Sequence, residues 1–272
     1  MEKLKIKILV SGSASFDFEG LSPQELTEII KKHKIRCPKC KGEFKDVGIL
    51  NMMFPLQVGI SEKVAYLRPE TAQGAYVNFK QSFETMRRKL PLGLTIIGKA
   101  YRNEISPRNL LIRMREFTQA ELQIFFDPEK INVHEKFDDI ADYKLRLFSV
   151  ADRNINKVQE LTCREVVMKL KLPRFYVYHL AKIQQFYLDL LKLPIGKFRF
   201  RELSEEERAF YNKIHWDIEL DVESLGGWKE VGGLHYRTDH DLSGHQKVSG
   251  EKLSITMDGR SFIPHVLELS FG

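Results

Sequence analysis

Residues 94–127 constrain the fold of this chain most strongly, because they predict two neighbouring strands joined by a short polar turn around Ser106–Asn109. Side chains along a strand alternate between its two faces. One face of the predicted hairpin is therefore apolar and is expected to pack. The other face carries polar groups and an aromatic ring: Gly98, Ala100, Arg102 and Glu104 in the first strand, and Arg113, Arg115, Phe117, Gln119, Glu121 and Gln123 in the second.

The residue types on the polar face favour a nucleotide and an amino acid as ligands. Arginine forks match phosphate oxygens, an aromatic ring stacks on a purine, and a carboxylate suits an ammonium group. Taken alone, the charges also allow a second interpretation, a salt-bridged hairpin that is simply exposed to solvent.

Charge and cysteine content restrict the class of protein. Lys and Arg exceed Asp and Glu by 43 to 37, and the formal net charge of +6 is compatible with an RNA partner. Three cysteines argue against a disulfide framework. The amino-terminal residues 1–16 lack the apolar core of a signal peptide, and no apolar run approaches membrane-spanning length. We therefore expect a cytoplasmic protein without a membrane partner.

Composition and pattern divide the chain into four segments. Residues 1–60 form an N-terminal segment with a helix and a Cys-x-x-Cys sequence, residues 61–128 and 196–272 form two parts of one sheet, and residues 129–195 form a helical insertion.

Local signals predict further elements. Residues 4–10 alternate as a short edge strand, and Ser22 and Glu25 form a capping box that opens a helix ending near Lys34. Thr71 is expected to cap a second helix. Further helices are predicted over residues 133–153 and 164–192, and from a capping box at Ser204–Glu207 through Tyr211.

Cys37 and Cys40 are spaced like half of a zinc knuckle. A structural zinc site needs four ligands, and the sequence offers no second pair. His33 or Cys163 would be the remaining imidazole and thiol helpers. Two free thiols on a turn are the favoured interpretation, and a zinc half-site is the alternative.

Several ordered motifs resemble those of a known family. The pattern Arg102-x-Glu104, a loop, and Arg113-x-x-x-Phe117-x-x-x-Glu121 is similar to motif 2 of class II aminoacyl-tRNA synthetases. Further stretches extend the resemblance over residues 22–272: Leu67–Gly74, Gly98–Arg108, Arg115–Glu121, Trp228–Glu230, Arg237–Leu242 and Pro264–Gly272. Together they resemble glycyl-tRNA synthetases of the dimeric kind found in archaea and eukaryotes.

The resemblance implies both a fold and an activity. The fold would be α+β, a class II synthetase-like antiparallel sheet of six or seven strands flanked by helices, with the helical insertion. The activity would be that of a glycine-tRNA ligase, which uses ATP and Mg²⁺ to activate glycine and attaches it to tRNA(Gly). A glycine pocket excludes every larger amino acid by steric clash, so no editing domain is expected.

The same resemblance assigns roles by position. Arg102 and Arg113 would be catalytic and would hold the phosphates, and Phe117 would stack on adenine, with Glu104 at the adenine edge. The glycine would be bound by Glu70, Glu121, Arg237, Glu268 and Ser270.

The chain also departs from the family pattern. Nothing like motif 1 is found in residues 1–20, and the chain stops at Gly272, before the motif 3 arginine and the anticodon-binding domain. Leu269 stands where proline is usual, and His235 and Tyr236 replace small residues before Arg237. We expect a catalytic-core piece that is incomplete alone and turns over poorly, since one lost transition-state arginine typically raises the barrier by several kcal/mol. A homodimer or a complementing C-terminal fragment would be its protein partner. The alternative is a non-catalytic relative that binds nucleotide, amino acid or RNA.

Overall fold

A computed structural model describes residues 22–60, 63–104, 107 and 112–272. The chain divides into two compact units, 1–51 and 52–272. The strand predicted over residues 4–10 and most of the predicted turn Ser106–Asn109 lie outside the described residues.

In the first unit, the capping box predicted at Ser22 is confirmed. Helix α1 (Pro23–Lys32) begins directly after Ser22, whose backbone N–H donates to Glu25 Oε2 at 2.7 Å, while Glu25 N–H donates to Ser22 Oγ at 3.3 Å. Pro23 occupies the first helical position, where its missing N–H has no intrahelical partner to lose. The N–H of Val47 donates to Thr27 Oγ1 at 2.9 Å and fixes the following segment against this helix.

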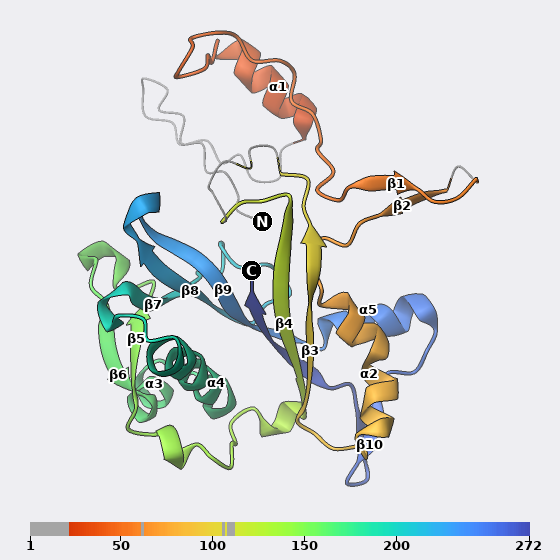
Figure 1. The fold of residues 1–272 in the computed structure, drawn as a ribbon, viewed down its shortest axis with the longest axis vertical. Helices are drawn as coiled ribbons and strands as arrows, with labels where there is room; N and C mark the ends of the chain where they lie inside the picture. The colour runs from red at the N-terminus through yellow and green to blue at the C-terminus, as the bar shows by residue number, and fades with distance from the viewer. Residues whose placement is uncertain (1–21, 61–62, 105–106, 108–111) are drawn as a thin grey trace. The chain divides into compact units, whose positions relative to one another are not determined.

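In the second unit, eight strands form one sheet in the order β3-β4-β12-β9-β8-β7-β5-β6 (Figure 1). The strands are β3 (Leu92–Tyr101), β4 (Glu116–Phe126), β5 (Lys144–Phe148), β6 (Gln159–Thr162), β7 (Phe198–Glu202), β8 (Ile214–Val222), β9 (Gly227–Thr238) and β12 (His265–Phe271). Two small hairpins, β1 (Pro55–Gln57) with β2 (Val64–Tyr66) and β10 (Ile255–Met257) with β11 (Arg260–Phe262), complete the strands of the described residues.

The α+β class with a sheet flanked by helices is confirmed, but two details of the expected sheet are wrong. It has eight strands instead of six or seven, and β5 pairs with β7 in parallel, whereas its other neighbouring strands are antiparallel. Both differences arise at the same end of the sheet, where β5 and β6 add to it.

Residues 129–195 were expected to form a helical insertion, but they are not helical throughout. They include helices α3 (Cys163–Lys169) and α4 (Arg174–Gln185), but also β5 and β6. Leu145, Leu147 and Phe148 are buried, so this stretch contributes to the core as a strand. The helix expected after Ser204 is also wrong: residues 205–207 form a turn, although Ser204 N–H donates to Glu207 Oε2 at 3.0 Å as in a capping box. Glu207 also pairs with Arg153 and Arg201 at 2.7 and 2.6 Å.

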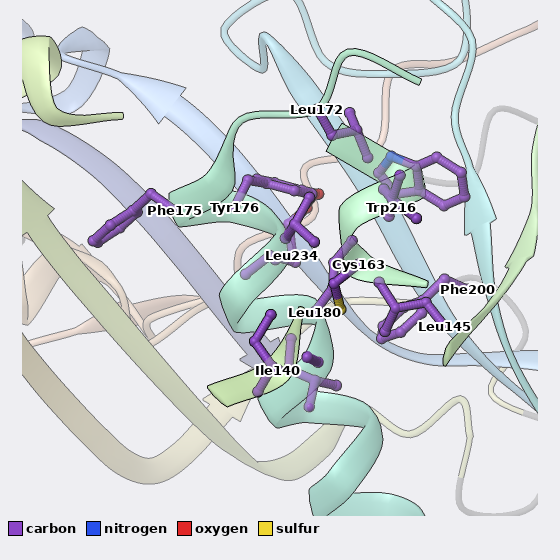
Figure 2. Packing of buried hydrophobic residues seen from close by; sticks show 14 of the residues in the cluster. Ile140, Leu145, Cys163, Leu172, Phe175, Tyr176, Leu180, Phe200, Trp216 and Leu234 are labelled. Carbon is purple, nitrogen blue, oxygen red and sulfur yellow. Dashed lines mark hydrogen bonds between the residues drawn. The ribbon is translucent and has the colours of Figure 1, made fainter. Parts of the chain in front are cut away.

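The two faces of the sheet are covered differently. One face packs on α3 and α4 through a large apolar cluster that includes Leu180, Trp216 and Leu234 (Figure 2). There the Tyr176 hydroxyl donates to the Leu234 carbonyl oxygen at 2.6 Å. A second apolar cluster joins the opposite face to α2 (Gln73–Thr85) and α5 (His240–Ser249) and includes Phe79 and Phe125. The described helices include none that is both long and apolar enough to cross a membrane.

Candidate functional site

The hairpin formed by β3 and β4 places the predicted polar residues on the face that carries α2 and α5. Gly98 pairs with Gln119 and Ala100 with Phe117, so the predicted face is confirmed for the paired residues. The side chains of Gln119, Glu121 and Gln123 are buried, with 3, 4 and 0% of their surface exposed. This burial favours an enclosed polar site over a salt-bridged hairpin exposed to solvent, because buried polar groups need specific partners.

Glu121 is held by the segment that leads into α2. The backbone N–H and the hydroxyl of Thr71 donate to Glu121 Oε2 at 3.0 and 2.7 Å, and the same N–H also approaches Gln119 Oε1 at 3.2 Å. The prediction that Thr71 caps α2 is therefore wrong. Ala72 is the N-cap residue, and its side chain makes no capping hydrogen bond. Burial raises the pKa of Glu121, opposed by the bond from Thr71 and reinforced by the nearby charge of Glu70.

Glu268 lies opposite Gln123 on the neighbouring strand β12 and forms the centre of a buried network. It accepts from Gln123 Nε2 at 2.8 Å and from Arg237 Nη1 at 3.1 Å, and the Tyr76 hydroxyl donates to it at 3.4 Å. Burial raises the pKa of Glu268 to about 7. The Arg237 charge acts in the opposite direction, while Glu121 and Glu70 raise the pKa further.

Arg237 is shared between two carboxylates. Besides Glu268, it donates to both oxygens of Asp241, four residues further along the chain in α5, at 2.7 and 2.8 Å. This bidentate pair fixes the guanidinium plane. The predicted glycine ligands Glu121, Arg237 and Glu268 are therefore brought into one buried network.

Glu70 and Ser270 flank this network. Glu70 is half-buried and accepts from Gln73 Nε2 at 2.9 Å, and its charge contributes to the raised pKa values of Glu121 and Glu268. Ser270 is half-buried and pairs with Glu121 on one side and with Gly233 on the other. Three carboxylates whose charges raise the pKa of Glu121 and Glu268 would be stabilised by a cation, and an ammonium group has the matching charge and donors.

A second group lies where β3 ends and β4 begins. The guanidinium carbon of Arg102 lies 5.3 Å from the centre of the Phe117 ring, and its Nε donates to the Pro69 carbonyl oxygen at 3.0 Å. The backbone oxygen of Glu104 accepts from Arg115 Nε at 3.2 Å. An arginine beside a half-buried ring can bind a phosphate and stack a purine. Arg113 is half-buried close to this group in the sequence, but the loop between them lies outside the described residues.

The sequence did not single out several residues that complete the network. Tyr76, whose hydroxyl donates to Gln123 Oε1 at 2.9 Å, and Asp241 were not assigned a role. Arg237 ends strand β9 while Asp241 begins α5, so the four-residue spacing between them is not a helical pairing signal, and only the fold brings the two side chains together.

Cys37 and Cys40 lie in the first unit on a tight turn. Lys41 N–H donates to the Cys37 carbonyl oxygen at 2.9 Å, and Cys37 N–H to the Gly42 carbonyl oxygen at 2.9 Å. Backbone N–H groups of Cys40 and Lys39 lower the pKa of the Cys37 thiol. Within the described part of the chain, no group of three or more His, Cys, Asp or Glu side chains could hold a metal ion, so these two thiols do not make a complete zinc site there.

Comparison with known proteins decides the family. A sequence profile described as the tRNA synthetase class II core domain (G, H, P, S and T) matches residues 60–245. The chain belongs to the class II tRNA synthetases. The match covers the hairpin, the segment before α2 and most of α5, so the class II core contains most of the candidate site.

Two related proteins show which class II synthetases this chain resembles. A glycine–tRNA ligase of Pyrococcus furiosus is 47% identical over 251 residues, which cover 91% of this chain and 44% of that protein. One of Methanococcus maripaludis strain C6 is 39% identical over 269 residues, covering 95% of this chain and 46% of the relative. The resemblance to glycyl-tRNA synthetases is thus confirmed, and the chain spans less than half the length of these relatives.

Comparison with a solved structure gives information on the fold only. A prolyl-tRNA synthetase of Cryptosporidium parvum, complexed with L-proline and AMP, aligns over 81% of this chain and 35% of its own with a TM-score of 0.51 and 16% identity. Its similarity confirms the class II architecture of the sheet.

Proposed function

We propose that this chain is a catalytic-core piece of a glycyl-tRNA synthetase, which activates glycine with ATP and transfers it to tRNA(Gly). The observation that carries the proposal is the buried carboxylate network of Glu121 and Glu268, built around Arg237 and close in sequence to an arginine–aromatic pair. Such a network suits an amino-acid ammonium group, and such a pair suits a nucleotide. The similarity to glycine–tRNA ligases supports glycine as the amino acid.

Each side chain has a proposed role. Glu70, Glu121 and Glu268 bind the ammonium group of glycine, Ser270 assists them, and Arg237 lies by the carboxylate. Arg102 holds the α-phosphate and Arg113 the γ-phosphate. Phe117 stacks on adenine, and Glu104 borders the adenine edge.

This arrangement suits a reaction that needs alignment more than a protein nucleophile. A glycine carboxylate oxygen attacks the α-phosphorus of ATP, the acyl–phosphate bond forms, and pyrophosphate leaves. A ribose hydroxyl of the tRNA then attacks the acyl carbon and AMP leaves. The arginines neutralise charge that develops on the phosphate. Mg²⁺ carried by the nucleotide would add to that neutralisation, and no step is assigned to a protein-bound metal.

The same network can select glycine by exclusion. Tyr76, Gln123 and Glu268 are buried and hydrogen-bonded to one another. They fill space that a larger amino-acid side chain would need, and displacing them would leave polar groups without partners. We place this protein in the cytoplasm, with a homodimer or a complementing C-terminal fragment as its protein partner.

Glycine-dependent exchange of pyrophosphate into ATP tests the proposal. Arg102→Ala and Glu121→Ala should each abolish exchange, because one removes phosphate binding and the other removes an ammonium ligand. Glu160→Ala, which breaks the ion pair of Arg146 in β5 with Glu160 in β6, is the matched control and should retain exchange.

Binding without exchange would favour a non-catalytic function. A chain that binds a glycyl-adenylate analogue but supports no exchange is a non-catalytic relative that retains the fold for binding.

A further inference from the structure

The hydroxyl of Tyr76 lies inside the amino-acid network, and the proposed mechanism gives it no role in the chemistry. Tyr76 is the fourth residue of α2, and its side chain is completely buried. Its ring packs edge-on against the Phe125 ring, with the ring centres 6.1 Å apart and the planes at 88°. The ring is therefore held in one place, with its hydroxyl directed at side chains of β4 and β12.

The Tyr76 hydroxyl has two acceptors within reach. Its oxygen lies 2.9 Å from Gln123 Oε1 and 3.4 Å from Glu268 Oε2. It has one proton to donate, and the shorter distance favours Gln123. Burial and the charge of Glu268 raise the pKa of Tyr76 well above its ordinary 10, so the hydroxyl stays protonated and remains a donor.

The amide of Gln123 links Tyr76 to Glu268. Its Nε2 donates to Glu268 Oε2 at 2.8 Å, while its Oε1 accepts from Tyr76. An ionised carboxylate can only accept, so it needs the nitrogen side of the amide. The reversed amide would place its oxygen against a carboxylate oxygen. The proton of Tyr76 therefore holds the amide in the orientation that ionised Glu268 requires.

This chain of donors favours the ionised form of Glu268. Both hydrogen bonds point toward the negative charge, and successive hydrogen bonds polarise one another. A hydrogen bond to an ionised acceptor is about twice as strong as one to a neutral acceptor. Loss of the first donor should therefore cost the ionised carboxylate more than the protonated one.

Further titratable and charged groups surround Glu268 and Tyr76. They are Glu70 before α2, Glu121 on β4, Tyr211 before β8, His235 and Arg237 on β9, and Asp241 and His245 on α5.

The charges among these groups do not suffice to keep Glu268 ionised. Glu121 and Glu70 raise its pKa, and Arg237, which lowers it, is shared with Asp241. Burial lowers the pKa of His235 well below its usual value, so that ring adds no positive charge. The neutral donors on the side of α2 and β4 are thus needed for ionisation.

We propose that Tyr76 is a positioning residue for glycine activation, whose hydroxyl holds the Gln123 amide in the orientation that keeps Glu268 ionised for the ammonium group. The hydroxyl does not touch glycine and acts through Gln123 and Glu268. The inference rests on the proposed function, because that function makes Glu268 a glycine ligand.

The pH profile of pyrophosphate exchange tests the proposal. Tyr76→Phe retains the ring and removes the hydroxyl. It should move the acidic limb of the apparent second-order rate constant for glycine upward by about 0.5–1 pH unit. The rate constant should therefore fall about fivefold at pH 6.5 but less than about twofold at pH 8.5. A merely structural loss would lower the rate constant by the same factor at both pH values.

Tyr176→Phe is the matched control. Tyr176 is equally buried, and its hydroxyl donates to the Leu234 carbonyl oxygen at 2.6 Å on the opposite face of the sheet. This variant should lower the unfolding midpoint and leave the acidic limb of the profile where it is in the unsubstituted protein. An equal movement of the limb in both variants would overturn the role of Tyr76.

Glycine binding measured by calorimetry gives a readout that does not need catalysis. Titrations at pH 7 in two buffers of different ionisation enthalpy yield the number of protons released per glycine. The unsubstituted protein should release about 0.5 proton, because Glu268 with a pKa of about 7 is half protonated and the ammonium group favours its ionised form. Tyr76→Phe should release about 0.8 proton and bind glycine more weakly.

A double substitution tests whether Gln123 transmits the effect. Adding Tyr76→Phe to Gln123→Met should move the acidic limb much less than Tyr76→Phe does in the unsubstituted protein. An undiminished movement would show that Tyr76 acts on Glu268 directly and would overturn the positioning of the amide.

The two measurements separate this inference from the proposed function. Exchange with an unmoved limb and unchanged proton release in Tyr76→Phe would overturn the role of Tyr76 and retain the proposed function. Absent exchange together with the expected difference in proton release would contradict the proposed function and retain the role of Tyr76 in a glycine-binding site.

Discussion

At the scale of single residues, burial determines the chemistry of the site. Glu268 is 4% exposed and has a pKa raised to about 7, although Arg237 donates to it. The desolvation of the carboxylate therefore outweighs the attraction of one arginine that Asp241 also engages. A bound ammonium group would lower the pKa of Glu268 and favour the ionised carboxylate.

The pH dependence of glycine use should follow from Glu268. The apparent second-order rate constant for glycine in pyrophosphate exchange should fall about tenfold per unit as pH decreases below about 7, because protonation removes an ammonium ligand. A profile that stays flat between pH 5.5 and 8 would contradict this assignment.

The unfolding free energy should change with pH in the direction opposite to the rate constant for glycine. The pKa is higher in the folded protein than the ordinary 4.5, so the folded state binds more protons between these values and loses stability as pH rises through about 7. The unfolding free energy measured against Glu268→Gln, which has no ionisation there, isolates this effect.

At the scale of elements, alternation predicted the hairpin face correctly, because a period of two is a local property. The role of Thr71 could not be predicted in the same way. Its usual role before a helix is capping, but the pairing of β3 with β4 brings Glu121 to it from 50 positions away. Strands β5 and β6 were missed for a similar reason: they are short, and their lysine-rich and aromatic surroundings resemble helix.

Close packing of β9 on β12 gives a prediction for one glycine. A Cβ at Gly232 would lie 2.3 Å from the Ser270 carbonyl oxygen, which is backbone and cannot rotate away. Gly232→Ala should lower the unfolding free energy by about 1–3 kcal/mol and weaken glycine binding, because Ser270 moves with its strand.

Gly244 offers the matched control. It lies inside α5, and an added Cβ would meet nothing within 4 Å. Gly244→Ala should stabilise the protein by about 0.5–1 kcal/mol in chemical denaturation. Equal effects of the two substitutions would show that the close approach of the strands is unimportant.

At the scale of the whole unit 52–272, stability and chemistry lie on opposite faces of the sheet. The cluster around α3 and α4 contains most of the buried apolar residues, while the carboxylate network lies on the face of α2 and α5. The α+β class and the family could be predicted from the ordered motifs. Tyr76 and Asp241 could not, because only the fold brings them to Glu268 and Arg237.

Because the apolar cluster and the carboxylate network lie on opposite faces, a variant should be able to lose stability and still retain its affinity for glycine. Leu180→Ala removes a fully buried side chain from α4 and should lower the unfolding free energy by about 2–5 kcal/mol, with glycine affinity unchanged well below the melting temperature. Leu190→Ala, which is 69% exposed just after α4, should change neither property. A large loss of glycine affinity in Leu180→Ala would show that the two faces are coupled.

The bond between Gln123 and Glu268 joins residues 145 positions apart. Closing so long a loop is entropically unfavourable and slow. During synthesis on the ribosome, the β3–β4 hairpin is complete long before β12 emerges, so Glu121 and Gln123 of the carboxylate network are in place before Glu268 can join them. Glycine binding to the nascent chain would therefore report the completion of the sheet.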